Sequence, residues 1–199
     1  MSRSMTHALT LLTTWFCCPL TLVKKMKLLI LDIDGVMTNG TKVYDDDHNV
    51  LSKSYNDKDF TAIKIFKQMG IDVCFLSSDT SINKGMALER DIDFFYSRNP
   101  DGTISKAKFL PSLMERYDAD VSEVVYIGDD LFDLDIMLEL PEPNRVCPGD
   151  APKYLKDKCG CVLSRHGGTG VVAEYLEKYS NVNNIDVCEV MMDASGTLR

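Results

Sequence analysis

Residues 27–40, KLLILDIDGVMTNG, constrain the fold of this chain more than any other stretch. Five of the seven positions from Leu28 to Asp34 are apolar, and a short, almost continuous apolar run predicts a strand that is buried on both faces. The run ends in Asp32 and Asp34. Two carboxylates at the edge of an apolar core repel each other and lose hydration. The pair therefore predicts a compensating cation, a shared proton or a reaction on a phosphate.

Short apolar runs alternate with amphipathic segments after Met26. This alternation predicts strands joined by crossover helices, and therefore an α/β fold: a Rossmann-like three-layer sandwich around a mostly parallel sheet. We expect strands at residues 28–33, 72–76, 94–96, 124–127, 145–147 and 161–163. We expect helices at residues 59–69 (with Asp59 as N-cap and Gly70 as terminator), 82–90, 106–117, 131–138, 151–157 and 170–179.

One segment interrupts the alternation. Residues 40–56 place strand-like residues on either side of a polar, turn-rich centre, Asp45-Asp46-Asp47-His48-Asn49. We expect a projecting β-hairpin here, with the three aspartates at its solvated tip.

The length of 199 residues allows one well-packed domain. We expect it at residues 26–180, after an N-terminal extension at 1–25 and before a flexible C-terminal tail at 181–199. The extension contains the apolar run ALTLLTTWFCCPLTLV. Two interpretations are open: a segment for export or membrane association, or, as we favour, residues upstream of a true start at Met26.

The charge and the cysteines restrict the partners and the compartment. The formal net charge is -8, with acids along the whole chain, so we expect no nucleic-acid partner and no membrane partner. Seven cysteines without regular spacing are typical of a reducing compartment, so we expect a cytoplasmic protein. Cys159 and Cys161 are half of a zinc-site pattern, but no second pair or histidine cluster completes four ligands.

Polar residues follow the predicted strands. In an open α/β sheet, ligands bind beyond the carboxyl ends of the strands, so these residues should meet at one edge. They are Asp32 and Asp34 after the first strand, Ser77 and Ser78 after the second, Lys106 at a helix start, and Asp129, Asp130 and Asp133 after the fourth.

Converging carboxylates call for a cation that prefers oxygen ligands, and Mg²⁺ suits a few carboxylates plus a phosphate. With the cation bound, Asp32 is placed to attack phosphorus as a nucleophile, and Asp34 to serve as general acid and base. Ser77 and Lys106 would bind the phosphate oxygens. For Asp130 and Asp133 we leave two alternatives open: support of the site, or a helix-capping or surface role.

The segment Asp32-Ile33-Asp34-Gly35-Val36-Met37-Thr38 resembles the first motif of the haloacid dehalogenase superfamily of phosphohydrolases. Ser77 matches the second motif and Lys106 the third, and Gly128-Asp129-Asp130-Leu131-Phe132-Asp133 matches the fourth. The resemblance covers about residues 26–179. The hairpin in place of a large cap domain, together with YNDKD, YIGDDLFDLDIM and GGTGVVAEYL, is similar to the 3-deoxy-D-manno-octulosonate 8-phosphate phosphatases and their nine-carbon relatives.

This resemblance implies a phosphatase for a small phosphorylated sugar or sugar acid, working through an aspartyl-phosphate on Asp32. It assigns the metal contacts to Asp32, the backbone carbonyl of Asp34, and Asp129. It also implies a homotetramer in which neighbouring subunits and hairpins close the site.

The chain departs from the family pattern where the substrate would bind. Ser77-Ser78-Asp79 stands where many relatives have Ser-Gly-Arg, so an anion replaces a cation that can bind a carboxylate. Asp79, Lys58, Arg90 and Arg165 are candidate substrate contacts, in the same subunit or across a subunit boundary. His166 is a further candidate substrate contact, but we expect it to be structural or exposed rather than catalytic, because the expected mechanism already has its acid and base.

Two other functions are open. The first is a non-catalytic assembly module, like the phosphatase-like domain attached to some nucleotide-sugar synthetases. The second is a phospho-receiver domain, which also gathers acids, a hydroxyl and a lysine over a parallel sheet. In a receiver the adjacent acidic pair comes early, whereas Asp129-Asp130 comes late in this chain. This order disfavours the receiver.

Overall fold

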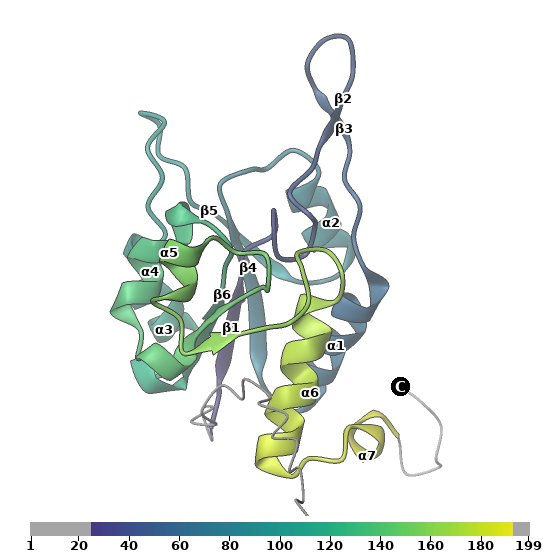
Figure 1. Ribbon diagram of the computed structural model, residues 1–199, viewed down its shortest axis with the longest axis vertical. Coiled ribbons are helices and arrows are strands. Elements are labelled where there is room, and N and C mark those ends of the chain that lie inside the picture. Colours follow the sequence, from purple (N-terminus) through teal and green to yellow (C-terminus); the bar gives the residue numbers. More distant parts are fainter. Residues whose placement is uncertain (1–24, 193–199) are drawn as a thin grey trace, which may run out of the picture.

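A six-stranded parallel sheet forms the centre of the computed structural model, which describes residues 25–192. The strand order is β5-β4-β1-β6-β7-β8 (Figure 1). The prediction of an α/β fold is confirmed, and each expected strand is present within two residues of its predicted ends. The strands are β1 (Leu28–Leu31), β4 (Asp72–Ser77), β5 (Asp93–Tyr96), β6 (Val124–Ile127), β7 (Arg145–Cys147) and β8 (Cys161–Val162).

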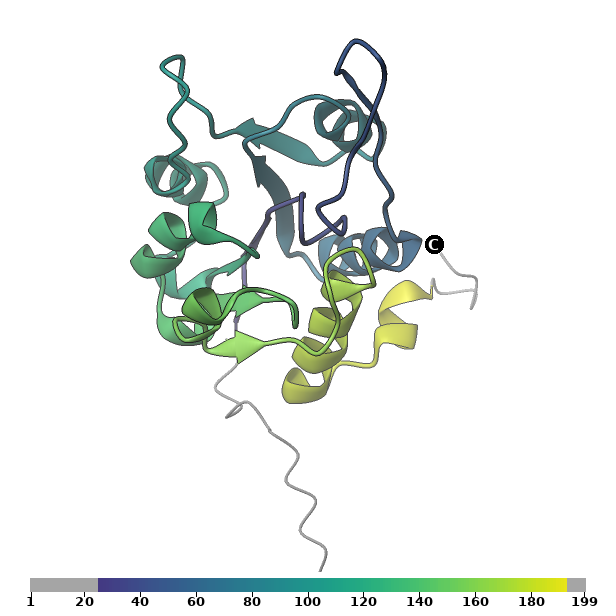
Figure 2. The same ribbon diagram turned by 45° about the horizontal axis from the view of Figure 1, so that its top comes forward.

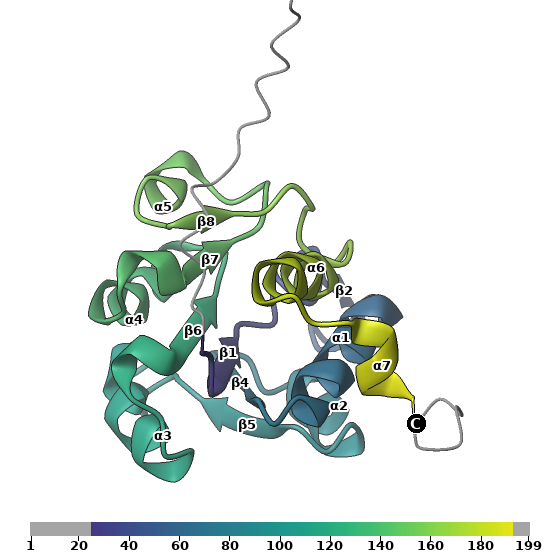
Figure 3. The ribbon, with the colours of Figure 1, turned by 90° about the horizontal axis from the view of Figure 1, so that it is seen from below.

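Helices cover both faces of this sheet (Figure 3). One face carries α1 (Asp57–Gln68), α2 (Asn83–Glu89), α6 (Val171–Asn183) and α7 (Val187–Met191). The other carries α3 (Leu110–Arg116), α4 (Leu134–Glu139) and α5 (Lys153–Lys156), and short 3-10 helices lie at Ala107–Phe109, Val121–Glu123, Leu131–Asp133 and Glu142–Asn144. Among residues 25–192, no helix has the length and apolar character needed to cross a membrane.

The position of β1 at the centre of the sheet explains why its residues are all apolar. Leu29 and Leu31 belong to the core on the α1 and α6 side. Leu28 and Ile30 belong to the core on the α3 and α4 side. Because successive side chains of a strand point to opposite faces and both faces are covered, every position of β1 is apolar and fully buried.

The start of α1 differs from the prediction. Asn56 is the N-cap, because its side chain accepts a hydrogen bond from the Lys58 N–H, so the assignment of Asp59 as N-cap was wrong. Asp59 is fully buried, and its Oδ1 accepts a hydrogen bond of 3.0 Å from the Ala173 N–H in the first turn of α6. Asp59 therefore joins two helices that are distant in sequence. The predicted terminator Gly70 does follow the helix, with φ +77°.

The C-terminal boundary also differs from the prediction. Helix α6 continues to Asn183, and α7 follows with Asp186 as its N-cap. Val187, Val190 and Met191 pack against the core, so residues 181–192 are not the flexible tail that we expected. Residues 1–24 and 193–199 lie outside the described residues, and the N-terminal boundary at residue 25 stays a prediction.

Two projections rise beyond the carboxyl ends of the strands (Figures 1 and 2). One is the predicted hairpin, formed by β2 (Val43–Tyr44) and β3 (Val50–Ser52). Its tip is hydrogen-bonded as well as solvated, because Asp45 Oδ1 accepts from the backbone N–H groups of Asp47 and Asn49. The other, unexpected projection is the loop 97–105, in which Arg98 and Ile104 form an antiparallel bridge.

The buried carboxyl of Asp59 predicts a measurable effect of pH on stability. Burial raises the pKa of Asp59 to about 6, so the stability that the protonated carboxyl contributes is fully present below its unfolded pKa and is lost as the pH rises through about 6. Asp59→Asn keeps an oxygen for the Ala173 N–H but cannot ionise. We expect the unfolding free energy of Asp59→Asn relative to wild type to rise by up to about 3 kcal/mol between about pH 4 and pH 7.

Urea unfolding at a series of pH values measures this difference. The matched control is Asp57→Asn, which removes an exposed carboxylate from the same turn of α1. A pH trend of equal size in both variants would contradict the assignment to Asp59.

Candidate active site

A pocket of about 390 Å³ opens at the carboxyl ends of β1, β4 and β6. The structure brings most of the predicted site residues into it. They are Asp32, Asp34, Ser77, Asp79, Lys106, Asp129, Asp130 and Asp133, and they are joined by residues that the sequence did not single out, among them Lys42, Tyr96 and Arg98.

Asp32 lies at the floor of this pocket. Its N–H donates to the Ile127 carbonyl at 2.9 Å, which continues the pairing of β1 with β6 beyond the strand. Its side chain is largely buried, and Oδ1 lies 2.9 Å from Lys106 Nζ. Burial raises the pKa of Asp32 to about 7, with a further contribution from the charge of Asp133, while Lys106 opposes the rise. The carboxylate is therefore held in place and poorly solvated.

Lys106 is 2 % exposed and is surrounded by acceptors. Its Nζ donates to Asp133 Oδ1 at 2.5 Å and to the Tyr126 hydroxyl at 3.0 Å. Burial alone would lower its pKa, but the charges of Asp133 and Asp32 hold that pKa above the usual range for lysine. Lys106 is therefore a permanently charged ammonium group beneath Asp32.

Asp133 is buried and accepts hydrogen bonds at both carboxylate oxygens. Its Oδ1 accepts from Lys106 and from the Tyr126 hydroxyl, and its Oδ2 accepts from the Asp129 N–H at 2.8 Å and the Asp130 N–H at 3.0 Å. The same carboxylate completes a capping box with Asp130 at the start of the following 3-10 helix. Both predicted roles, support of the site and helix capping, thus occur together.

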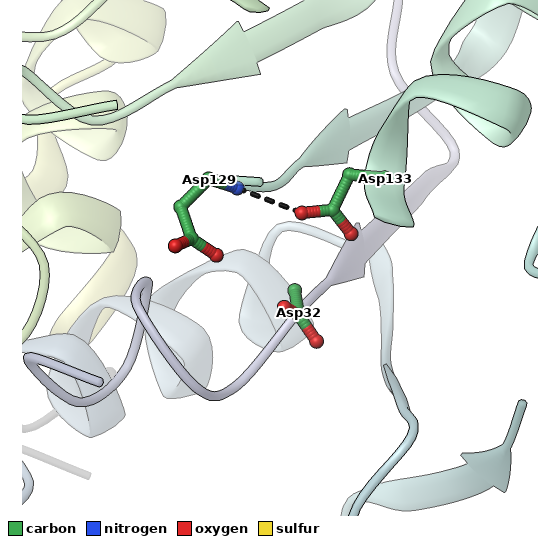
Figure 4. A group of neighbouring side chains, drawn as sticks. All are labelled: Asp32, Asp129 and Asp133. Carbon is green, nitrogen blue, oxygen red and sulfur yellow. Dashed lines mark hydrogen bonds between the residues drawn. The ribbon is translucent and has the colours of Figure 1, made fainter. Parts of the chain in front are cut away.

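Asp32, Asp129 and Asp133 place carboxylate oxygens within 4.8 Å of one another (Figure 4). Asp129 Oδ1 is buried and has no hydrogen-bond partner among the described residues. Burial and the charges of Asp32 and Asp133 raise the pKa of Asp129 to about 9. Because the oxygens of Asp133 are already hydrogen-bonded, Asp32 and Asp129 are the two carboxylates that fit a divalent cation, and an all-oxygen site suits Mg²⁺.

Gly35 makes this arrangement possible. Its φ is +100°, and a Cβ atom built on it would lie 2.0 Å from Asp129 Oδ2. A side chain at this position would therefore displace the Asp129 carboxylate.

The Asp34 side chain points to a different group of residues. Its carboxylate accepts hydrogen bonds from Lys53 Nζ at 2.7 and 2.9 Å and from Asn83 Nδ2 at 3.0 Å. It is not part of the three-carboxylate group, so any metal contact of Asp34 would come through its backbone carbonyl, as the resemblance implies. Two carboxylates two residues apart are thus placed in separate environments.

Ser77 is buried at the end of β4. Its Oγ accepts hydrogen bonds from the Asp79 N–H at 3.2 Å and from Asn83 Nδ2 at 3.3 Å. The hydroxyl lines the pocket and is held at a fixed position there.

Two lysines of the same chain balance the charge of Asp79. Its Oδ2 lies 2.6 Å from Lys42 Nζ and 3.0 Å from Lys53 Nζ, and its Oδ1 accepts from the Ser81 N–H at 2.9 Å. Burial favours a higher pKa, but hydrogen bonds from Lys42, Ser81 and Lys53 hold the pKa of Asp79 well below its usual range. Asp79 thus faces the two lysines as a carboxylate.

Lys42, Lys53 and Asn83 were missed in the sequence. The hairpin register contained a signal for the lysines, because Val43 pairs with Ser52 and Lys42 and Lys53 are the next residues toward the base of the hairpin. A hairpin predicted directly after Asp34 should place its base residues near that carboxylate. For Asn83 we find no comparable sequence signal.

Four predicted substrate contacts, Lys58, Arg90, Arg165 and His166, do not line this pocket. Lys58 and Arg165 line a separate groove beside α1 and α6. The Arg90 guanidinium lies over the Phe60 ring, 4.1 Å from its centroid. The expectation that these residues contact substrate bound in the same subunit is therefore not supported by their positions. His166 is exposed, and its carbonyl closes a turn with the Thr169 N–H.

Comparison with known proteins identifies relatives of this chain. No family model matches the chain. The chain is 31% identical over 153 residues to 3-deoxy-D-manno-octulosonate 8-phosphate phosphatase of Haemophilus influenzae, covering 76% of this chain and 81% of that protein. It is 26% identical over 175 residues to the enzyme of that name from Escherichia coli K12, covering 88% of this chain and 84% of that protein.

A solved structure is also similar to this chain. The cobalt-bound form of the deoxy-D-mannose-octulosonate 8-phosphate phosphatase from Haemophilus influenzae superposes with a TM-score of 0.75 at 29% identity, covering 87% of this chain and 97% of that chain.

The raised pKa values of Asp129 and Asp32 predict how a divalent cation changes stability. Each protonated carboxyl contributes stability at low pH. The contribution of Asp32 is lost as the pH rises through about 7, and that of Asp129 as the pH rises through about 9. A cation bound to the ionised pair compensates for this loss. We therefore expect Mg²⁺ to raise the melting temperature by several degrees at about pH 8.5 and by less at about pH 6.

Asp129→Asn should melt at a higher temperature than wild type in the presence of a chelator, because it removes the carboxylate that ionises at the highest pH, and it should lose the response to Mg²⁺. Asp130→Asn, an exposed neighbour that keeps a capping side chain, serves as control in the same thermal scans. An unchanged Mg²⁺ response in Asp129→Asn would contradict the assigned ligand.

Proposed function

The chain belongs to the family of the 3-deoxy-D-manno-octulosonate 8-phosphate phosphatases, cap-less phosphatases of the haloacid dehalogenase superfamily, and we propose that it hydrolyses a small phosphorylated sugar or sugar acid. In this proposal the reaction proceeds through an aspartyl-phosphate on Asp32, with Mg²⁺ as cofactor. The observation that carries the proposal is the pair Asp32 and Asp34 in one pocket, the first held by Lys106 and the second by Lys53. First candidates for the substrate are 3-deoxy-D-manno-octulosonate 8-phosphate and its nine-carbon analogues.

The contacts of Asp32 suit a nucleophile. Lys106 holds Oδ1, which leaves Oδ2 to form a bond to phosphorus while the bond from phosphorus to the sugar oxygen breaks. Ser77 and Lys106 line the same pocket and supply hydrogen-bond donors for the phosphate oxygens. A divalent cation bound by Asp32 and Asp129 would offset their mutual repulsion and the negative charge of the phosphate.

We assign the role of acid and base to Asp34, which lines the same pocket as Asp32. In the first step Asp34 gives its proton to the departing sugar oxygen, and in the second it takes a proton from the water that attacks the aspartyl-phosphate. The overall reaction consumes one water and releases the sugar and inorganic phosphate. Lys53 and Asn83 fix the orientation of the Asp34 carboxylate through three hydrogen bonds.

The hairpin supports the prediction of a homotetramer. Val43, Tyr44 and Leu51 are each more than half exposed, although covering apolar side chains lowers the free energy of the system. A neighbouring subunit that covers the hairpin would also close the open side of the pocket. The cytoplasmic location stays a prediction from the cysteine pattern.

Asp32→Asn tests the nucleophile. The amide keeps the shape of the side chain but cannot attack phosphorus, so we expect phosphate release to fall by at least about 10³-fold. Release is measured with Mg²⁺ over p-nitrophenyl phosphate, 3-deoxy-D-manno-octulosonate 8-phosphate and a panel of sugar phosphates. Circular dichroism of the variant checks that the fold is retained. Undiminished turnover would contradict the proposal, and a wild-type chain inactive on every ester would favour the non-catalytic assembly module.

Asp34→Asn tests the acid and base separately. The p-nitrophenolate group leaves without needing a proton, whereas a sugar alkoxide needs one. We therefore expect the variant to lose more activity on sugar phosphates than on p-nitrophenyl phosphate, and to accumulate protein carrying one phosphoryl group. Intact-protein mass spectrometry after rapid quenching detects that species. Equal loss on both ester types without a phosphorylated protein would refute the assigned role.

A further inference from the structure

The loop 97–105, the second projection beside the pocket, is an ordered, hydrogen-bonded turn. The Asn99 N–H donates to the Thr103 carbonyl at 2.7 Å, and the Gly102 N–H donates to the Asn99 carbonyl at 2.9 Å. Asp101 Oδ1 accepts from the Thr103 N–H at 2.9 Å. Arg98 lies at the base of this turn, paired across it with Ile104.

The Arg98 guanidinium is held by backbone carbonyls. Its Nε donates to the Ser78 carbonyl at 3.3 Å and its Nη1 to the Gly102 carbonyl at 3.1 Å. The first contact connects it to the loop that follows β4, next to Ser77. Nη2 has no acceptor among the described residues, and the side chain lines the pocket.

The charges of the pocket single out this residue. Three cationic side chains line it: Lys42, Arg98 and Lys106. Lys106 is paired with Asp32 and Asp133, and Lys42 is paired with Asp79. Among the residues that the structure describes, Arg98 has no acidic partner, so its charge is available to an anionic group of the substrate other than the phosphate that Ser77 and Lys106 would bind.

We propose that Arg98 is a specificity-determining residue that binds the carboxylate of a phosphorylated sugar acid; this rests on the function proposed above. The planar guanidinium presents paired N–H groups that match the two oxygens of a carboxylate. The two carbonyl contacts fix the guanidinium before substrate arrives, so little side-chain freedom is lost on binding. The ordered turn thus supplies the pocket with a cation that is held by two backbone carbonyls.

Steady-state kinetics on two substrates tests the proposal. Arg98→Gln and Arg98→Lys are compared with wild type on 3-deoxy-D-manno-octulosonate 8-phosphate, which carries a carboxylate, and on arabinose 5-phosphate, which carries none. We expect Arg98→Gln to lower kcat/KM for the sugar acid by about 10- to 100-fold, mainly through KM, and to change the neutral sugar by less than about threefold. Arg98→Lys should recover part of the loss.

Lys108→Gln is the matched control. It removes one positive charge from an exposed side chain that contacts Asn99 of the same turn but does not line the pocket. Calorimetric binding of 3-deoxy-D-manno-octulosonate 8-phosphate to the Asp32→Asn protein, with and without Arg98→Gln, gives a readout that does not depend on turnover.

The outcomes separate the two proposals. A selective loss for the sugar acid, in kcat/KM or in binding, supports the role of Arg98. Equal losses for both sugars, or a loss of the same size in Lys108→Gln, overturn it. A wild-type protein without phosphatase activity refutes the proposed function, while the binding comparison still decides for or against Arg98.

Discussion

Mutual repulsion among carboxylates is the constraint on which the rest of this structure depends. Asp32, Asp129 and Asp133 meet at the edge of an apolar core, where charge is poorly solvated. The fold compensates with one buried ammonium group, Lys106, which contacts Asp32 and Asp133. Among the residues that the structure describes, Asp129 receives no such contact and its buried Oδ1 has no hydrogen-bond partner, so a cation bound there would balance its charge.

A second group of charges is built on the same edge but kept apart from the first. Lys53 lies between Asp34 and Asp79 with its side chain fully buried, and Lys42 adds a further contact to Asp79. This separation gives two acids of one short motif different surroundings. Asp32 lies in the three-carboxylate group, and Asp34 accepts hydrogen bonds from Lys53 and Asn83.

The sequence predicted the sheet and the residues at its edge because both follow from local pattern. A continuous apolar run reports burial on both faces, and parallel strands bring their carboxyl ends together, so Asp32, Ser77 and Asp129 could be placed without coordinates. The role of Asp59 could not, because its partner is the Ala173 N–H of a distant helix. Arg98 could not be placed either, because nothing in its local sequence shows that its turn folds back on Ser78.

Lys53 lies at the base of the β2–β3 hairpin, and the two strands of the hairpin carry the exposed apolar residues Val43, Tyr44 and Leu51. These apolar residues lie within a few positions of Lys53 on one two-stranded ribbon. A protein surface that covers these strands would contact the ribbon that positions Lys53, and Lys53 donates hydrogen bonds to the Asp34 carboxylate. In the proposed assembly, the orientation of Asp34 would therefore depend on the neighbouring subunit as well as on its own chain.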